Sequence, residues 1–98
     1  MEKRIPHCKL SIIRALVKAG KVRATSSALA SGAVLNMGFE DMISVIMALT
    51  PRDFYKSMTS YNDHRIWHDV YHAVTREGQV YLKLIVIDDV LIVSFKEL

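Results

Sequence analysis

Two apolar runs, residues 80–87 and 90–95, flank the dipeptide Asp88-Asp89. Short runs of β-branched and apolar residues on either side of a turn predict a β-hairpin, although Asp tolerates a positive φ less well than Gly does. No other feature restricts the fold as strongly, because the register of such a hairpin decides which side chains share a face. A face that carries only apolar side chains must be covered by another layer.

A turn centred on Asp88-Asp89 determines the expected pairing. The pairs are Ile87 with Val90, Ile85 with Ile92, Lys83 with Ser94, and Tyr81 with Lys96. One face then carries only Leu82, Leu84, Val86, Leu91, Val93 and Phe95. The other face ends in polar residues, where Lys83 fits either a solvated strand position or a phosphate contact. The pair of Tyr81 and Lys96 indicates a surface that binds or transfers phosphate, because Lys supplies a point charge and Tyr supplies a proton or a stacking ring.

The first half of the chain predicts helices. Three stretches have helical spacing or composition: residues 10–17, 26–35 and 39–49. Gly20 is a natural stop for the first helix, and Thr25 is a typical N-cap for the second. Pro51 ends the third, because a residue before proline is disfavoured in the α region.

The second half predicts strands, at residues 54–59 and 66–74 in addition to the hairpin. A turn centred on Glu77-Gly78 pairs Val74 with Tyr81 and His72 with Lys83, unless a bulge at Gly78 reverses the faces. Helices followed by antiparallel strands indicate an α+β fold, with N-terminal helices packed on one face of an antiparallel sheet.

Composition and charge narrow the class of protein. Ninety-eight residues, 51% of them hydrophobic, make one domain, residues 1–98. The single Cys8 excludes an intramolecular disulfide and fits a reducing compartment. No run approaches the ~20 apolar residues of a membrane span, so we expect a cytoplasmic protein with no membrane partner. The net charge is +3, with cations crowded into residues 3–23, either on a solvated helix face or on a surface that faces phosphate.

Three histidines, His64, His68 and His72, recur every fourth residue. Helical spacing would line them up as metal ligands, but the residues between them prefer a strand, on which they stand ~13 Å apart. We therefore expect no metal site. A single histidine in acid–base work is favoured, because its unperturbed pKa lies near neutrality.

Long stretches of the chain resemble one known family. The similar segments are residues 53–71 (DFYKSMTSYNDHRIWHDVY), residues 78–97 (GQVYLKLIVIDDVLIVSFKE), the start MEKRIPH and residues 20–23. They resemble the motility quorum-sensing regulator (MqsR) toxins, which belong to the RelE-like mRNA interferases. The resemblance implies a RelE-like fold and a ribosome-independent endoribonuclease that cuts mRNA at short GC-containing sequences and arrests growth. It also implies a cognate zinc-binding antitoxin of the MqsA type, through which alone the toxin would meet DNA.

The resemblance also places the site. It implies catalytic roles for Lys56, Tyr81 and Lys96, with Met58 beside them. His68 stands where the family usually has glutamine, and we expect it to support catalysis. Asp88 replaces a usual histidine and receives no role. Lys83 and His72 are expected RNA contacts.

Cleavage without metal or cofactor needs a base for the 2′-hydroxyl, positive charge for the phosphorane and an acid for the 5′-oxygen. We expect Lys56 and Lys96 to stabilise the phosphate, one of them with a lowered pKa as a possible base, and Tyr81 to donate a proton or stack. The product would be a 2′,3′-cyclic phosphate. Two alternatives remain: a non-catalytic nucleic-acid-binding module, and an interaction protein whose strand edge pairs with the antitoxin.

Overall fold

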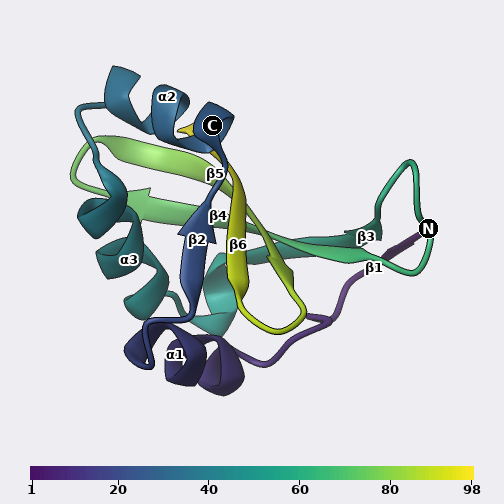
Figure 1. Cartoon of the computed structure of the whole chain (residues 1–98). Coiled ribbons are helices and arrows are strands. Elements are labelled where there is room, and N and C mark those ends of the chain that lie inside the picture. The colour runs from purple at the N-terminus through teal and green to yellow at the C-terminus, as the bar shows by residue number, and fades with distance from the viewer.

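The computed structural model describes residues 1–98 as three helices and one six-stranded sheet (Figure 1). The helices are α1 (Leu10–Lys18), α2 (Ser26–Val34) and α3 (Phe39–Met47), with a 3₁₀ turn, η1, at Pro51–Asp53. The strands are β1 (Glu2–Lys3), β2 (Val22–Ala24), β3 (Phe54–Thr59), β4 (Trp67–Thr75), β5 (Gly78–Val86) and β6 (Val90–Glu97).

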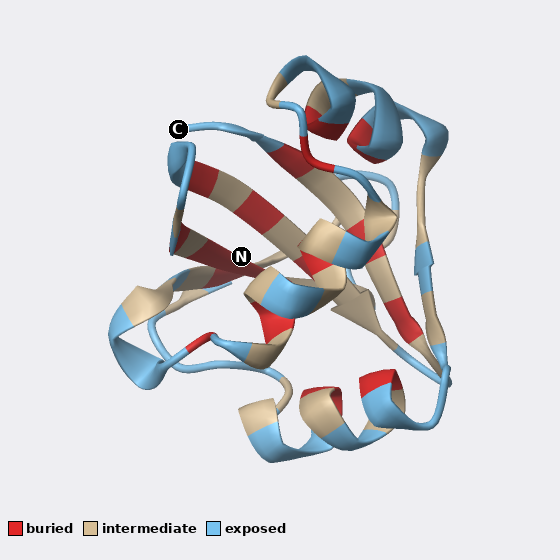
Figure 2. Ribbon diagram, turned by 90° about the vertical axis from the view of Figure 1, so that its left-hand side faces the viewer, coloured by how far each residue is buried: buried red, intermediate tan, exposed pale blue.

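The strand order is β1-β3-β4-β5-β6-β2, and every pair is antiparallel except β2 with β6. The helices lie on one side of this sheet, and buried residues alternate with more exposed ones along its strands (Figure 2). The core joins Ile13, Met42 and Ile46 of the helices to the sheet residues Tyr71, Leu82, Leu84, Ile92 and Phe95. The expected α+β fold is confirmed.

Local signals place the helix ends as expected. The Thr25 hydroxyl accepts a hydrogen bond from the Ala28 amide at 3.1 Å, which caps α2. Gly20 follows α1 with φ 78°, a conformation that glycine adopts without strain. The last helix stops at Met47, slightly before the expected end, and Pro51 begins the 3₁₀ turn.

The β5–β6 hairpin has a different turn from the expected one. Val86, rather than Ile87, pairs with Val90, so three residues form the loop. A bulge at Val93 then restores the expected pairs, Lys83 with Ser94 and Tyr81 with Lys96. Our assignment of Leu91 and Val93 to the buried face was therefore wrong; the residues of β6 in the core are Val90, Ile92 and Phe95.

The β4–β5 hairpin also turns earlier than expected. Its turn is Arg76-Glu77, with Thr75 opposite Gly78. His72 consequently pairs with Tyr81 instead of Lys83. The partner of each β4 residue therefore lies two positions away along β5 from the expected one. Because side chains alternate with a period of two, the expected faces are unchanged.

Both sheet edges are short strands from the first quarter of the chain, which the sequence pattern did not indicate. β1 has two residues and β2 has three. A partner that adds a strand would meet one of these two edges. No single helix has the length and apolar composition to cross a membrane; α2 and α3 together do, but they are bent by 90°.

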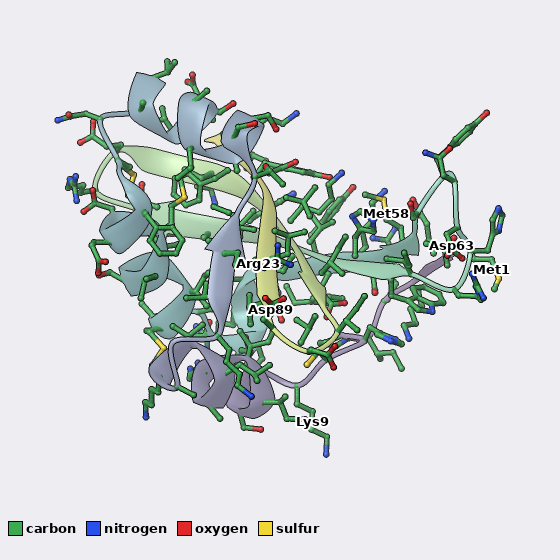
Figure 3. All side chains as sticks on the ribbon, viewed as in Figure 1. Met1, Lys9, Arg23, Met58, Asp63 and Asp89 are labelled. Atoms are coloured by element: carbon green, nitrogen blue, oxygen red, sulfur yellow. The ribbon has the colours of Figure 1, made fainter.

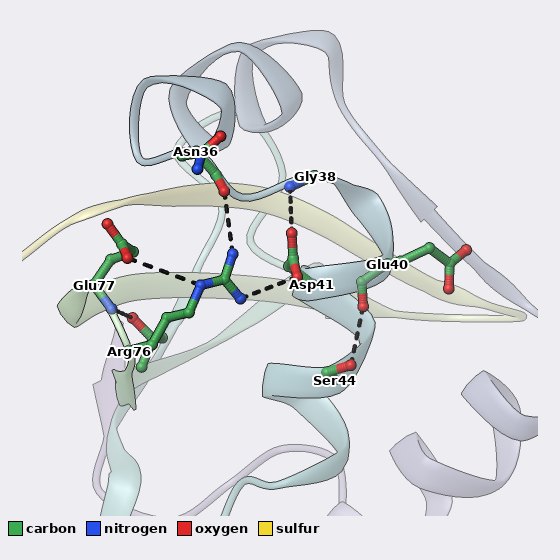
Figure 4. Close-up of polar contacts among 8 residues, drawn as sticks. Asn36, Gly38, Glu40, Asp41, Ser44, Arg76 and Glu77 are labelled. Carbon is green, nitrogen blue, oxygen red and sulfur yellow. Dashed lines mark hydrogen bonds and ion pairs between the residues drawn. The ribbon is translucent and has the colours of Figure 1, made fainter.

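An ion-pair network ties the helix layer to the β4–β5 turn (Figure 4). Arg76 donates to the Asp41 carboxylate and to the Asn36 carbonyl, each at 3.2 Å. Asp41 also accepts from the Gly38 amide at 2.9 Å, at the start of α3. The network lowers the pKa of Asp41, chiefly through the hydrogen bond from Arg76.

Gly32 of α2 packs too closely against its neighbours to accommodate a side chain. A Cβ at this buried position would lie 2.3 Å from Met42 Cε and 2.8 Å from the Met37 carbonyl oxygen, which is backbone and cannot swing aside. Gly32→Ala should therefore lower the free energy of unfolding by ~1–3 kcal/mol in urea titration. Gly38→Ala, where a Cβ meets nothing within 4 Å, is the control. Equal stability of both variants would contradict this packing argument.

Candidate active site on the open face

The sheet face away from the helices, called the open face below, carries three rows of side chains. One row is His72, Tyr81 and Lys96, from β4, β5 and β6. The next is Lys56, Val70, Lys83 and Ser94, and the third is Met58, His68 and Ile85. Neighbouring strands are ~4.8 Å apart, and neighbouring rows ~7 Å. All seven expected site residues therefore occupy one surface.

A bulge in β3 adds one more side chain, that of Tyr55, to the open face. Phe54 pairs with Tyr71 and Lys56 with Val70, so Tyr55 is the extra residue. Its ring stacks on His72 with centroids 4.2 Å apart, and His72 lies 6.2 Å from the Tyr81 ring. Arg4 lies 5.5 Å from the Tyr55 ring. Neither Tyr55 nor Arg4 was predicted from the sequence. Alternation alone places Tyr55 on the opposite face, and Arg4 lies far from Tyr55 along the chain.

Three lysines on the open face differ in their surroundings. Lys56 Nζ contacts Glu2 Oε1 at 2.5 Å, and this hydrogen bond raises the pKa of Lys56. Burial lowers the pKa of Lys83, and the positive charge of Lys96 lowers it further. Lys96 Nζ lies 5.3 Å from the Tyr81 ring centroid. Lys56 is thus held as a cation, and the lysine with the lowered pKa is Lys83.

His68 borders a hollow of about 350 Å³ beside the β3–β4 connection. Its other lining residues are Met58, Thr59, Ser60, Tyr61 and Lys83. Both ring nitrogens of His68 are buried without a hydrogen-bond partner. Burial lowers the pKa of His68, and the nearby charge of Lys83 acts in the same direction. His64 lies in the β3–β4 connection rather than on the strand, and no group of three potential metal ligands is present.

The basic first quarter does not form one surface. Helix α1 packs on the core side, where Arg14 donates to the Leu49 carbonyl. Arg23 pairs with Asp89 at 2.6 Å, at the β5–β6 turn (Figure 3). Among these cations, Arg4 reaches the aromatic side chains of the open face. The cations of α1 therefore lie on the other side of the sheet from the open face.

The whole chain matches one family of toxins. A family model described as "Motility quorum-sensing regulator, toxin of MqsA" matches residues 5–97. The chain belongs to the MqsR toxin family. It is also 58% identical over 97 residues to the mRNA interferase toxin MqsR of Escherichia coli strain K12, a match that covers 99% of each chain. The resemblance that the sequence indicated is confirmed.

The polar rows of this MqsR-family toxin generate a prediction about His68. Lys83→Gln should raise the pKa of His68, because it removes a positive charge that disfavours the imidazolium. The wild-type value should lie below the ordinary 6.5. An NMR titration of the imidazole resonances measures both values. Lys21→Gln, outside the open face, is the control, and a wild-type pKa above 6.5 would contradict the burial argument.

Proposed function

We propose that this MqsR-family toxin is a metal-independent endoribonuclease that cleaves mRNA on the open face. The observation that carries the proposal is that Lys56, Tyr81, Lys83 and Lys96 lie on two adjacent rows of one sheet face. Of these four, Lys56 contacts an acidic side chain, that of Glu2. Such a surface can bind a phosphodiester and supply protons to it. The name of the Escherichia coli relative supports the choice of mRNA as substrate.

Charge stabilisation in this mechanism comes from Lys56 and Lys96. The 2′-hydroxyl attacks the adjacent phosphorus, the bond to the 5′-oxygen breaks, and a 2′,3′-cyclic phosphate and a 5′-hydroxyl result. Lys56 stays protonated, because its contact with Glu2 raises its pKa, so we assign it to the phosphorane charge and not to the base. Lys83, with its pKa lowered, is the better lysine candidate for the base.

The roles of the remaining side chains follow from the row of the open face in which each lies. Tyr81 lies between His72 and Lys96, where it can donate a proton to the 5′-oxygen. His68 pairs with Ile85, four residues along β5 from Tyr81, which is ~13 Å at strand rise. We therefore assign His68, with Met58, to a neighbouring nucleotide, and His72 to the nucleotide at the cleaved bond.

The cellular setting follows from the family. We propose a single toxin domain that acts in the cytoplasm, cuts at short GC-containing sequences independently of the ribosome, and is restrained by an MqsA-type antitoxin. The family description, which names a toxin of MqsA, supports this partner. Contact with DNA would come through the antitoxin complex.

Cleavage of a defined mRNA in excess EDTA tests the proposal. Wild-type protein should cut and leave 2′,3′-cyclic phosphate ends, and Lys56→Ala should be at least ~100-fold slower, because an uncompensated charge develops in the transition state. End mapping and gel kinetics measure both. A folded wild-type sample that binds the RNA in a salt-dependent way but never cuts it would overturn the proposed enzymatic activity and favour a non-catalytic nucleic-acid-binding module.

Two tyrosines provide a matched test of proton donation. Tyr81→Phe should lower kcat by ~10–100-fold with little change in KM, because it removes the proposed acid and keeps the ring. Tyr71→Phe is the control: this hydroxyl is buried on the core side and has no hydrogen-bond partner. The control should keep full activity and normal or slightly higher stability. Full activity of Tyr81→Phe would assign Tyr81 to stacking instead.

A further inference from the structure

The segment Met1–Cys8, called the strap below, crosses from the helix layer to the edge of the open face. Its β1 residues pair with β3, Glu2 opposite Met58 and Lys3 opposite Ser57. The Thr59 amide donates to the Met1 carbonyl at 2.9 Å, and Figure 3 places Met1 and Met58 at the same end of the sheet. Two residues of pairing are too few to hold a strand by themselves, so other contacts must fix the strap.

A buried carboxylate provides the main anchor. Asp69 is 2% exposed and lies on the core-side face of β4. Its Oδ1 accepts from the His7 amide at 2.8 Å, and its Oδ2 accepts from the Cys8 amide at 2.9 Å. Hydrogen bonds to a charged acceptor are stronger than neutral ones, and a buried carboxylate without them would be costly. Asp69 therefore fixes the place at which the strap leaves the helix layer.

Alternation along the strap then separates its side chains. Lys3 lies over the Trp67 ring at 4.1 Å and contacts His7 Nδ1 at 3.0 Å, while the His7 ring stacks on Trp67 at 5.5 Å. These contacts hold the strap from the side opposite to the open face. Glu2, with the reverse orientation, reaches Lys56.

We propose that Asp69 and Glu2 are positioning residues for Lys56: Asp69 anchors the strap through the His7 and Cys8 amides, and the strap holds Glu2 against the Lys56 ammonium on the open face. The inference rests on the proposed function in that Lys56 is taken to stabilise the reacting phosphate. Neither carboxylate touches substrate in this scheme. Glu2 takes one of the three donors of Lys56, and the others remain for a phosphate oxygen.

The contact between Glu2 and Lys56 orders the lysine side chain in the free protein. A lysine side chain loses rotamer entropy when it is fixed, and a contact already formed in the free protein supplies that ordering before RNA binds. The groups that face Lys56 are Glu2 from β1, Tyr55 beside it in β3, and Tyr81 from β5. Arg4 acts on Glu2 in turn and lowers the pKa of that carboxyl, although the Lys56 hydrogen bond contributes more.

Two variants test the two steps separately. Glu2→Gln removes the charge of a half-exposed side chain, so we expect the variant to fold normally. It should lower kcat by ~3–10-fold with KM little changed, because Lys56 is no longer fixed. Asp69→Asn should likewise lower kcat with KM little changed. In the Glu2→Gln background it should lower kcat by less than a further ~2-fold, because both residues act through one lysine. All rates are taken per folded molecule.

A second readout does not depend on cleavage. NMR titration of the lysine Cε resonances should show the pKa of Lys56 lowered in both Glu2→Gln and Asp69→Asn, because each variant removes or displaces the partner charge. Asp41→Asn is the matched control: Asp41 also accepts a backbone amide, but it lies in α3 on the other side of the sheet (Figure 4). It should cost stability and leave both kcat and Lys56 unchanged.

The outcomes separate this inference from the proposed function. Normal kcat in Glu2→Gln, together with an unmoved Lys56 resonance, would overturn the positioning role while Lys56-dependent cleavage still stands. Additive losses in the double variant would overturn the role of Asp69, because they would show that it affects the rate independently of Glu2 and Lys56. If the wild type cuts no RNA, the proposed function fails, and the Lys56 titration still decides whether the strap holds this lysine.

Discussion

Burial of one sheet face beneath three helices is the constraint on which the rest of the structure depends. Val80, Leu82 and Leu84 of β5 are fully buried against the helix residues. Side chains alternate along a strand, so that burial alone sends Tyr81 and Lys83 to the other side. The candidate site therefore requires no loop or pocket of its own. It is the second face of a sheet whose first face makes the core, so the packing of the core determines the backbone position of each site residue.

Two bulges adjust that simple arrangement, one on each side of the central strands. In β6 the extra residue Val93 lets Val90 and Ile92 face the core while Lys96 still faces Tyr81. Its carbonyl accepts from the Thr25 hydroxyl, which also caps α2, so helix and bulge support each other. In β3 the extra residue Tyr55 brings an aromatic ring onto His72. Bulges next to a functional surface typically redirect a side chain in this way.

The sequence allowed the helices, the four long strands and the sheet side of the expected site residues in β4, β5 and β6 to be predicted, because those features depend on local spacing and on a period of two. Lys56 and Met58 of β3 were placed in the site by the family resemblance instead. Thr25 and Gly20 carry local signals that tertiary packing did not override. The Val93 and Tyr55 bulges and the short strands β1 and β2 could not be predicted, since each is decided by packing or by partners distant in the chain. The turn at Arg76-Glu77 is local, but its sequence fits a turn one residue later equally well. Asp69 is a similar case: nothing in its neighbours indicates that it binds the backbone of His7 and Cys8.

The edge strands also have a consequence for how the chain folds. β1 and β2 come from the first quarter of the sequence, yet they complete a sheet whose other strands lie in the second half, and Val22 pairs with Val90 near the far end. Contacts of such long sequence separation carry a high loop-closure entropy, so folding should be slow for a chain of this length. Until both ends meet, β3 and β6 expose unpaired backbone groups, and intermediates of this kind associate through their edges. The short strands thus set the time during which the unfinished sheet is open to association with other chains.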